Sequence, residues 1–141
     1  MVLIFGCTRC KNSSKLGSLS FALKLSVLCY LCPPPGYCFT IEHGNEYRPI
    51  GIDIEYCEQV EEIGADSSII LFKRLSVVPK ALCLKHIGPY ERFYESYSES
   101  FNYMEELGYK MVGYMHTCYI DGVWNQDDPE LWLSFIQIPI E

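Results

Sequence analysis

The sequence has no cluster of lysines or arginines. Its 141 residues include 11 Lys and Arg against 18 Asp and Glu, which gives a formal net charge of -7. Positive side chains that neutralise phosphates supply most of the non-specific affinity for nucleic acids, so a chain with this charge repels a phosphate backbone. We therefore expect no direct binding to DNA or RNA.

The sequence also lacks an apolar run that is long enough to cross a membrane. The candidate, residues 16–32, contains Lys24 and falls short of the about 20 apolar residues that a spanning helix needs. Lysines precede the run, as in an export signal, but no small-x-small cleavage site follows it before Pro33. We interpret it as a buried helix of a cytoplasmic protein, with a signal anchor as the alternative.

The composition is that of a globular domain. Hydrophobic residues make up 49% and charged residues 21% of the chain, well away from the composition of disordered proteins. The length fits a single domain, residues 1–141, which buries a core without needing disulfides or a metal. Aromatic residues make up 14%, including 11 Tyr. Most of these rings fill core positions, but Tyr and Trp also suit a recognition surface or a pocket.

Two cysteine pairs need an interpretation. Cys7 and Cys10, like Cys29 and Cys32, are separated by two residues, and this spacing fits a zinc ribbon. The residues between the pairs form an apolar helical stripe, whereas a ribbon needs a polar hairpin. We expect reduced thiols, no metal and no cofactor, and structural zinc remains the alternative.

The second half of the chain shows one strong helix pattern. The helix is predicted to begin at Gly88-Pro89 and to end at Gly108, where glycine commonly terminates a helix. Its apolar residues recur at steps of three and four; they are Phe93, Tyr97, Phe101, Met104 and Leu107. Strands are predicted at residues 69–75 and 80–87 before the helix, and at 111–120 and 131–140 after it.

The first half repeats this order more faintly. A strand is predicted at residues 2–5, a helix at 14–31, and strands at 37–42 and 51–60. We infer an internal duplication, with half-repeats at about 1–62 and 68–141 joined by the linker 61–68. The predicted fold is α+β: two pseudo-symmetric strand-helix-strand-strand units form one antiparallel sheet with two helices packed on one face.

Five segments carry a resemblance to a known family: residues 35–43, 52–55, 85–91, 119–125 and 132–140. Together they resemble the GyrI-like family, the effector-binding domain found at the C-terminus of AraC-type and MerR-type transcription regulators. The combination of a His-x-Gly-Pro-Tyr helix entry with an Ile-Gln-Ile-Pro-Ile terminus is typical of it. The resemblance implies binding of a lipophilic, often cationic, small molecule, by a chain that looks like the stand-alone members.

The resemblance also implies which residues face the ligand. By strand alternation and family analogy, Glu55 and Phe135 lie at corresponding positions of the cleft, with Tyr37, Tyr114 and Trp124 around them. The family usually places an acidic residue where this chain has Phe135. Glu55 is then the single carboxylate, and with aromatic walls it could hold a cation; an exposed strand position is the alternative for Glu55.

No catalytic residue is predicted. The three histidines, His43, His86 and His116, fall on separate strands without a pattern linking them to a nucleophile. Our first hypothesis is a sensor or sequestering domain for a lipophilic molecule, without catalysis of its own. The second is a hydrolase that uses Glu55 to activate water. The third is a protein-interaction module of the gyrase-inhibitor kind.

Overall fold

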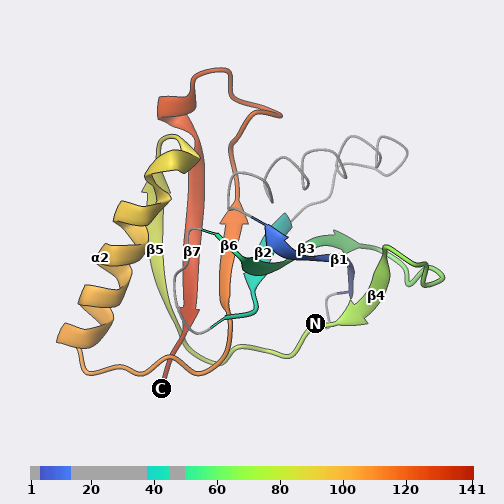
Figure 1. Cartoon of the computed structure of the whole chain (residues 1–141), viewed down its shortest axis with the longest axis horizontal. Helices are drawn as coiled ribbons and strands as arrows, with labels where there is room; N and C mark the ends of the chain where they lie inside the picture. Colours follow the sequence, from blue (N-terminus) through green and yellow to red (C-terminus); the bar gives the residue numbers. More distant parts are fainter. Residues whose placement is uncertain (1–3, 14–37, 45–49) are drawn as a thin grey trace. The chain divides into compact units, whose positions relative to one another are not determined.

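A computed structural model describes residues 4–13, 38–44 and 50–141 (Figure 1). The chain divides into two compact units, Met1–Ser76 and Val77–Glu141. Both contain antiparallel strands, and the second adds a helix, so the fold class is α+β as predicted. Within the described residues, no helix combines the length and the apolar character that crossing a membrane requires.

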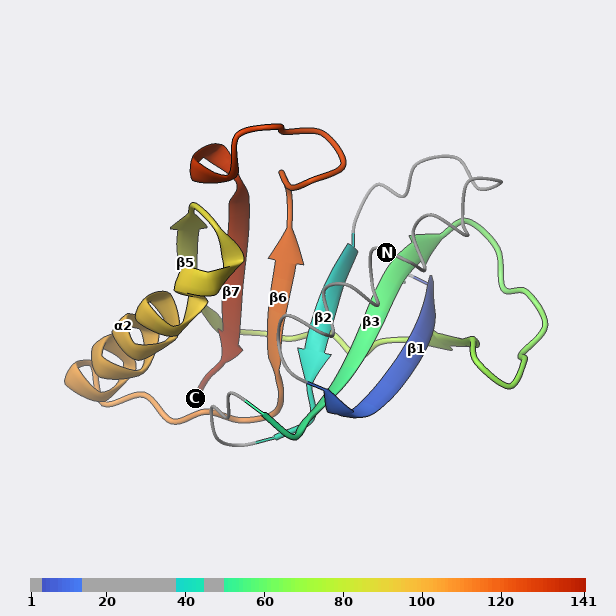
Figure 2. The ribbon, with the colours of Figure 1, turned by 45° about the horizontal axis from the view of Figure 1, so that its top comes forward.

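The first unit contains four described strands. They are β1 (Ile4–Ser13), β2 (Cys38–Glu42), β3 (Ile52–Val60) and β4 (Leu71–Arg74). Their order is β4-β1-β3-β2, and each neighbouring pair is antiparallel. Figure 2 shows β3 between β1 and β2. Strand β3 is therefore an interior strand of this sheet, and its side chains have neighbours on both β1 and β2.

Two boundaries in the first unit differ from the prediction. Strand β1 extends to Ser13, whereas the sequence indicated a strand over residues 2–5 only. Strand β4, which we assigned to the second half-repeat, pairs with β1 instead. Because β3 pairs with β1 as far as Ser13, the strand is longer than its irregular apolar pattern revealed.

Of the two cysteine pairs, the structure describes only the first. Cys7 and Cys10 lie within β1, where Cys7 pairs with Cys57 and Cys10 with Ile54. Their backbone is thus part of a sheet ladder. Cys29, Cys32 and the helix predicted at residues 14–31 lie outside the described residues, so the zinc alternative and the two-helix arrangement stay predictions.

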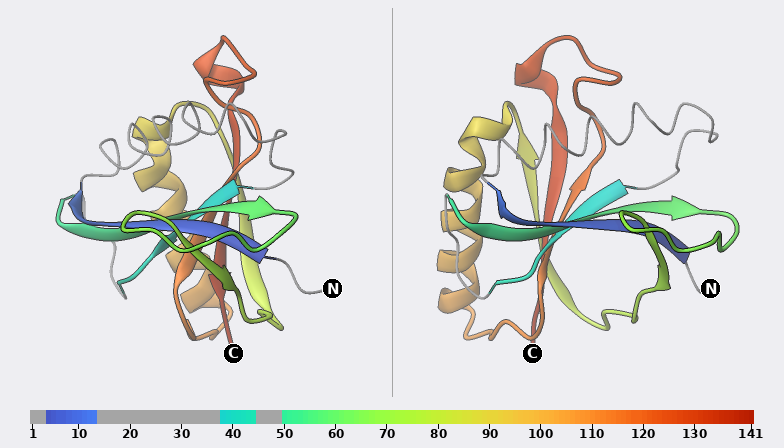
Figure 3. Two further views of the ribbon diagram at one scale, coloured as in Figure 1. Left: turned by 90° about the vertical axis from the view of Figure 1, so that its right-hand side faces the viewer. Right: turned by 45° about the vertical axis from the view of Figure 1, so that its right-hand side comes forward.

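The second unit contains three strands, one α-helix and two short 3-10 helices. They are β5 (Ala81–Ile87), η1 (Tyr90–Arg92), α2 (Phe93–Glu106), β6 (Met115–Tyr119), η2 (Pro129–Leu131) and β7 (Leu133–Pro139). The strand order is β6-β7-β5. Helix α2 runs alongside these strands (Figure 3). The helix and the three strands that the sequence predicted for this unit are confirmed, and the strands are shorter than predicted by a few residues at their ends.

Glycine defines both ends of the helical segment. Gly88 has a φ of 122°, which L-amino acids rarely adopt, and it turns the chain from β5 into η1. At the other end Gly108 has a φ of 70°. Its N–H donates to Glu105 O at 3.0 Å, and the N–H of Tyr109 donates to Met104 O at 3.0 Å, which is the Schellman arrangement that ends a helix.

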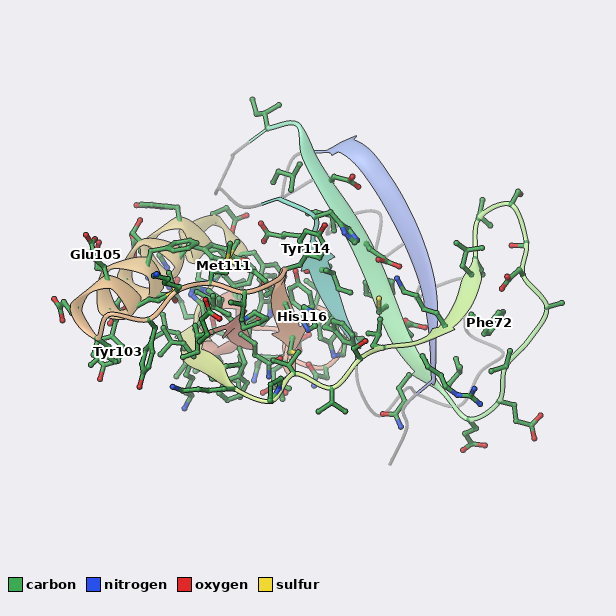
Figure 4. All side chains as sticks on the ribbon, turned by 90° about the horizontal axis from the view of Figure 1, so that it is seen from below. Phe72, Tyr103, Glu105, Met111, Tyr114 and His116 are labelled. Atoms are coloured by element: carbon green, nitrogen blue, oxygen red, sulfur yellow. The ribbon has the colours of Figure 1, made fainter. Side chains whose placement is uncertain are left out.

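The helix packs through its first half more than through its last turn. Phe93 and Tyr97 are buried, whereas Leu107, the last member of the predicted stripe, is half exposed. Tyr103 and Glu105 lie on the outer side of α2 (Figure 4). The predicted apolar stripe is therefore confirmed for its first two turns.

The helix identifies the two faces of the second unit. The Tyr97 hydroxyl and the Thr117 hydroxyl of β6 lie 2.6 Å apart in a buried hydrogen bond. Thr117 is opposite Ile136 on β7, and Ile136 and Ile138 are fully buried. Because successive residues of a strand alternate between faces, Phe135 points away from α2, as predicted.

The described strands of the two units have a common order. Strand β3 lies between β1 and β2 in the first unit, and β7 lies between β6 and β5 in the second. Each is the last strand of its predicted half-repeat. The helix of the second half-repeat is α2, whereas the helix predicted at residues 14–31 lies outside the described residues. The pseudo-symmetric repeat therefore stays a prediction.

Candidate ligand-binding residues

Glu55 of β3 lies at the centre of a polar cluster in the first unit. Its Oε2 is 2.8 Å from Nε2 of His43, and its Oε1 forms an ion pair with Nζ of Lys73 from β4. The side chain of Glu55 is only 6% exposed, against 13% for His43 and 37% for Lys73. The alternative that Glu55 is an exposed strand residue is therefore wrong.

The sheet register explains why His43 reaches Glu55. Glu55 is opposite Ile41 on β2, and the N–H of His43 continues the ladder by donating to Asp53 O at 2.8 Å. Residues two apart on a strand share a face, so His43 and Ile41 lie on the face of Glu55. The neighbouring residues of that face, Phe39 and Cys57, are also buried. The cluster thus has the apolar residues Ile41, Phe39 and Cys57 on one side, and Asp53 of the same face beside His43.

The partners of Glu55 keep it ionised. Burial by itself would raise the pKa of this carboxyl group, because a carboxylate loses solvation. Hydrogen bonds and positive charge from Lys73 and His43 outweigh burial and lower the pKa of Glu55 below its ordinary value of 4.5. A carboxylate with a lowered pKa is a weak base.

The opposite face of β3 carries a second polar group. The Tyr56 hydroxyl donates to Glu58 Oε1 at 2.6 Å. Burial and the nearby acidic groups raise the pKa of Tyr56, and burial and Glu58 raise that of the Cys38 thiol, although its hydrogen bond with Tyr56 acts in the other direction. Since the thiolate is the reactive form of cysteine, the raised pKa of Cys38 favours its less reactive thiol form.

In the second unit, the histidine of the His-x-Gly-Pro-Tyr entry is structural. His86 Nε2 is 3.2 Å from Pro89 O, and its Nδ1 is 2.7 Å from Ser96 Oγ. A carbonyl oxygen only accepts, so Nε2 carries the proton and Nδ1 accepts from the serine hydroxyl. Burial is the largest influence on His86 and lowers its pKa. The imidazole thus holds β5 to the start of α2 in its neutral form.

Phe135 lies on the other face of the second unit, away from α2. Its direct neighbours across the sheet are Lys85 on β5 and Cys118 on β6. Cys118 is buried, and its thiol donates to Gln137 Oε1 at 3.3 Å. Lys85 is exposed. This face therefore combines a half-buried phenyl ring with polar groups and one positive charge.

Tyr114 and Trp124 are partly exposed residues of the second unit, at 46% and 48%. Tyr114 directly precedes β6, as Figure 4 shows. Trp124 lies in a turn held by Asn125, whose side-chain oxygen accepts from Gly122 N at 2.9 Å. A Cβ on Gly122 would collide with the Trp124 ring and the Tyr90 hydroxyl, so the turn and this ring are closely packed. Both side chains are available for contact with a ligand.

The five predicted residues are thus distributed over the chain. Glu55 belongs to the first unit, Tyr114, Trp124 and Phe135 belong to the second, and Tyr37 lies outside the described residues. Sequence reasoning missed the partners of Glu55. The hairpin formed by β2 and β3 could have suggested His43, but Lys73 was hidden because β4 was assigned to the wrong half.

Comparison with solved structures identifies a close match. The crystal structure of the EcmrR C-terminal domain superposes with a TM-score of 0.88 and 27% sequence identity, over 99% of this chain and 92% of that one. EcmrR is a MerR-family regulator, and this part of it is the effector-binding domain. The fold is GyrI-like. This bears out the fold that the resemblance implied.

Further matches place this fold in two settings. In a cryo-electron microscopy structure of an EcmrR–DNA complex the TM-score is again 0.88, and this chain spans 54% of that longer chain. A hydrolase from Listeria innocua matches with a TM-score of 0.65 at 11% identity, over 99% of this chain and 88% of the other, which shows the fold alone. No protein-family model and no curated protein matches the sequence.

Proposed function

We propose that this chain is a small-molecule-binding domain that senses or sequesters a lipophilic ligand. The observation that carries the proposal is its match to the effector-binding domain of EcmrR, which extends over 99% of this chain. EcmrR itself also occurs in complex with DNA, and this chain spans about half of that regulator. We propose that ligand binding is coupled to transcription only in a protein where a DNA-binding segment accompanies this domain.

The proposed ligand contacts are Glu55, Phe135, Tyr114, Trp124 and Tyr37. Three features of the described residues support this set. Glu55 is a buried charged group next to the buried apolar residues Ile41 and Cys57. Phe135 is a half-buried ring on the sheet face that α2 leaves uncovered. Tyr114 and Trp124 offer exposed aromatic surface with a polar atom at one end.

The hydrolase hypothesis receives less support. A general base works best with a pKa near the working pH, and the pKa of Glu55 is lowered by Lys73 and His43 despite its burial. The Listeria innocua hydrolase is too distant in sequence to transfer an activity to this chain. The gyrase-inhibitor hypothesis and a cytoplasmic location remain predictions from the sequence.

A fluorescence titration tests the proposal. The neutral probe phenylnaphthylamine, which brightens in apolar surroundings, is expected to bind saturably and to raise the unfolding temperature, because a ligand that binds only the folded state stabilises it. Replacing the ring in Phe135→Ala should weaken binding by about tenfold, from the apolar area that the ligand no longer covers.

The matched control is Tyr103→Ala, which removes an exposed ring from the outer side of α2 and should leave the titration unchanged. Absence of saturable binding to the unmodified protein, for this probe and for a panel of lipophilic molecules, would refute a binding function. An equal loss of affinity in Phe135→Ala and Tyr103→Ala would show that Phe135 has no specific role in ligand binding.

A further inference from the structure

Both carboxylate oxygens of Glu55 already have a basic partner from this chain. Oε1 is paired with the Lys73 ammonium and Oε2 with the His43 imidazole, at 2.8 Å for the latter. The Lys73 ammonium thus offsets the negative charge of Glu55 from within the chain. A cationic ligand that approaches Glu55 must compete with a lysine that is held in place covalently.

The exposures of the two charged residues show which one a ligand meets first. The Glu55 side chain is 6% exposed, whereas that of Lys73 is 37% exposed. Lys73 belongs to the four-residue strand β4 at the edge of the first unit, and its ammonium contacts the buried carboxylate. Lys73 is thus the more exposed residue of the pair, and its ammonium lies beside the carboxylate that a ligand would have to approach.

We propose that Lys73 is a specificity-determining residue: it acts as an internal counter-ion of Glu55 and makes the domain select neutral or anionic lipophilic ligands over cationic ones. This inference rests on the proposed binding function and specifies its ligand class. It reverses the cation preference that a lone carboxylate among aromatic rings would produce.

Competition between two ions of nearly the same shape tests this proposal. Tetraphenylphosphonium and tetraphenylborate differ mainly in charge, and each is titrated against bound phenylnaphthylamine. The unmodified protein should bind the borate at least as tightly as the phosphonium. In Lys73→Met the lysine charge is gone, and the ratio of the two dissociation constants should move by about tenfold or more toward the phosphonium, as expected for one uncompensated charge near the ligand.

Two control variants assign the effect to charge. Lys73→Arg keeps a positive group and should retain the selectivity of the unmodified protein. The double variant Lys73→Met with Glu55→Gln removes both charges and should lose the gained preference for the phosphonium. Lys73→Gln provides a second neutral replacement if Lys73→Met does not fold, and thermal unfolding of each variant shows whether it does.

The possible failures are distinguishable. If phenylnaphthylamine and the ions do not bind the unmodified protein, the binding function and this inference are both wrong. If they bind but the ratio in Lys73→Met and Lys73→Gln stays within about twofold of that of the unmodified protein, only the counter-ion role is refuted. A preference of the unmodified protein for the phosphonium by about tenfold would refute it as well.

Discussion

Phe135 has a positive neighbour, and this changes what a substitution at this position should do. Lys85 lies directly opposite on β5, and side chains that face each other on antiparallel strands have Cβ atoms about 5 Å apart. A carboxylate introduced at position 135 would therefore lie close to the side chain of Lys85. In the first unit a lysine also accompanies a carboxylate, although Lys73 reaches Glu55 from β4, which pairs with β1 and not with β3.

We accordingly expect Phe135→Glu alone to raise affinity for tetraphenylphosphonium by less than about threefold, since Lys85 neutralises the new charge. The double variant Phe135→Glu with Lys85→Met should raise it by about tenfold relative to Phe135→Gln, the uncharged control. Displacement titrations on the three variants provide the measurement. Equal affinities in all three would mean that position 135 does not contact the ligand.

The strand alternation was sufficient to assign Phe135 to the face away from the helix, because a period of two is a local property of the backbone. It was also sufficient to place Glu55 on the face of Cys57. The lysines could not be assigned in this way. Which residue of a distant strand faces Glu55 depends on strand order and register, and these are set by packing of the complete sheet.

Among the elements, the β5–α2 connection shows that a recognisable motif can be structural. His86 binds Pro89 O and Ser96 Oγ, and the N–H of Gly88 donates to Trp132 O at 2.9 Å. Tyr90 packs against Trp132 with ring centroids 4.6 Å apart. The residues of the His-x-Gly-Pro-Tyr entry thus hold the helix against the strands and are separate from the proposed ligand contacts.

This connection should give the protein a pH-dependent stability. Burial lowers the pKa of His86 from 6.5, so the unfolded chain takes up a proton at a pH where the folded chain does not. The free energy of unfolding should therefore fall as the pH decreases from about 6.5 toward the lowered folded-state value, and the His86 contribution should be complete above that window.

The comparison variant is His86→Gln, which should lose about 1–3 kcal/mol at pH near 8 by leaving buried groups without their partner. Its deficit relative to the unmodified protein should shrink as the pH falls through the window. Urea unfolding at several pH values measures both curves. Parallel curves would show that His86 does not titrate differently in the two states.

At the scale of the whole molecule, charge is the property that most restricts the partners. A net charge of -7 repels a phosphate backbone, whereas the EcmrR match includes a chain bound to DNA. These two facts are compatible because this chain spans 54% of that one and matches its effector-binding part. The part of a regulator that this chain matches need not be the segment that contacts DNA.

We expect no binding of this chain to duplex DNA at physiological salt, since few lysines or arginines are available for phosphate contacts. Fluorescence anisotropy of a labelled duplex, titrated with protein to micromolar concentrations, is the measurement. A signal that weakens with added salt would reveal phosphate contacts and contradict the expectation.

The sequence by itself determined the elements and their faces. The helix of the second unit and its strands follow from local signals: apolar residues at steps of three and four, alternation along the strands, and Gly88, Pro89 and Gly108 at the helix ends. Each signal acts within one or two turns of chain. The resemblance to effector-binding domains likewise depended on short segments, and the EcmrR match bears out the fold that it implied.

Only the tertiary structure decided the length of β1, the position of β4 and the partners of Glu55. Strand β1 extends to Ser13 because β3 pairs with it that far, and β4, which pairs with residues 4–7 of β1, brings Lys73 to a carboxylate 18 residues earlier in the chain. Contacts of this kind arise from hydrogen bonding between segments that are distant in sequence, so no local pattern encodes them. The charge that a ligand meets at Glu55 is for this reason a property of the folded sheet.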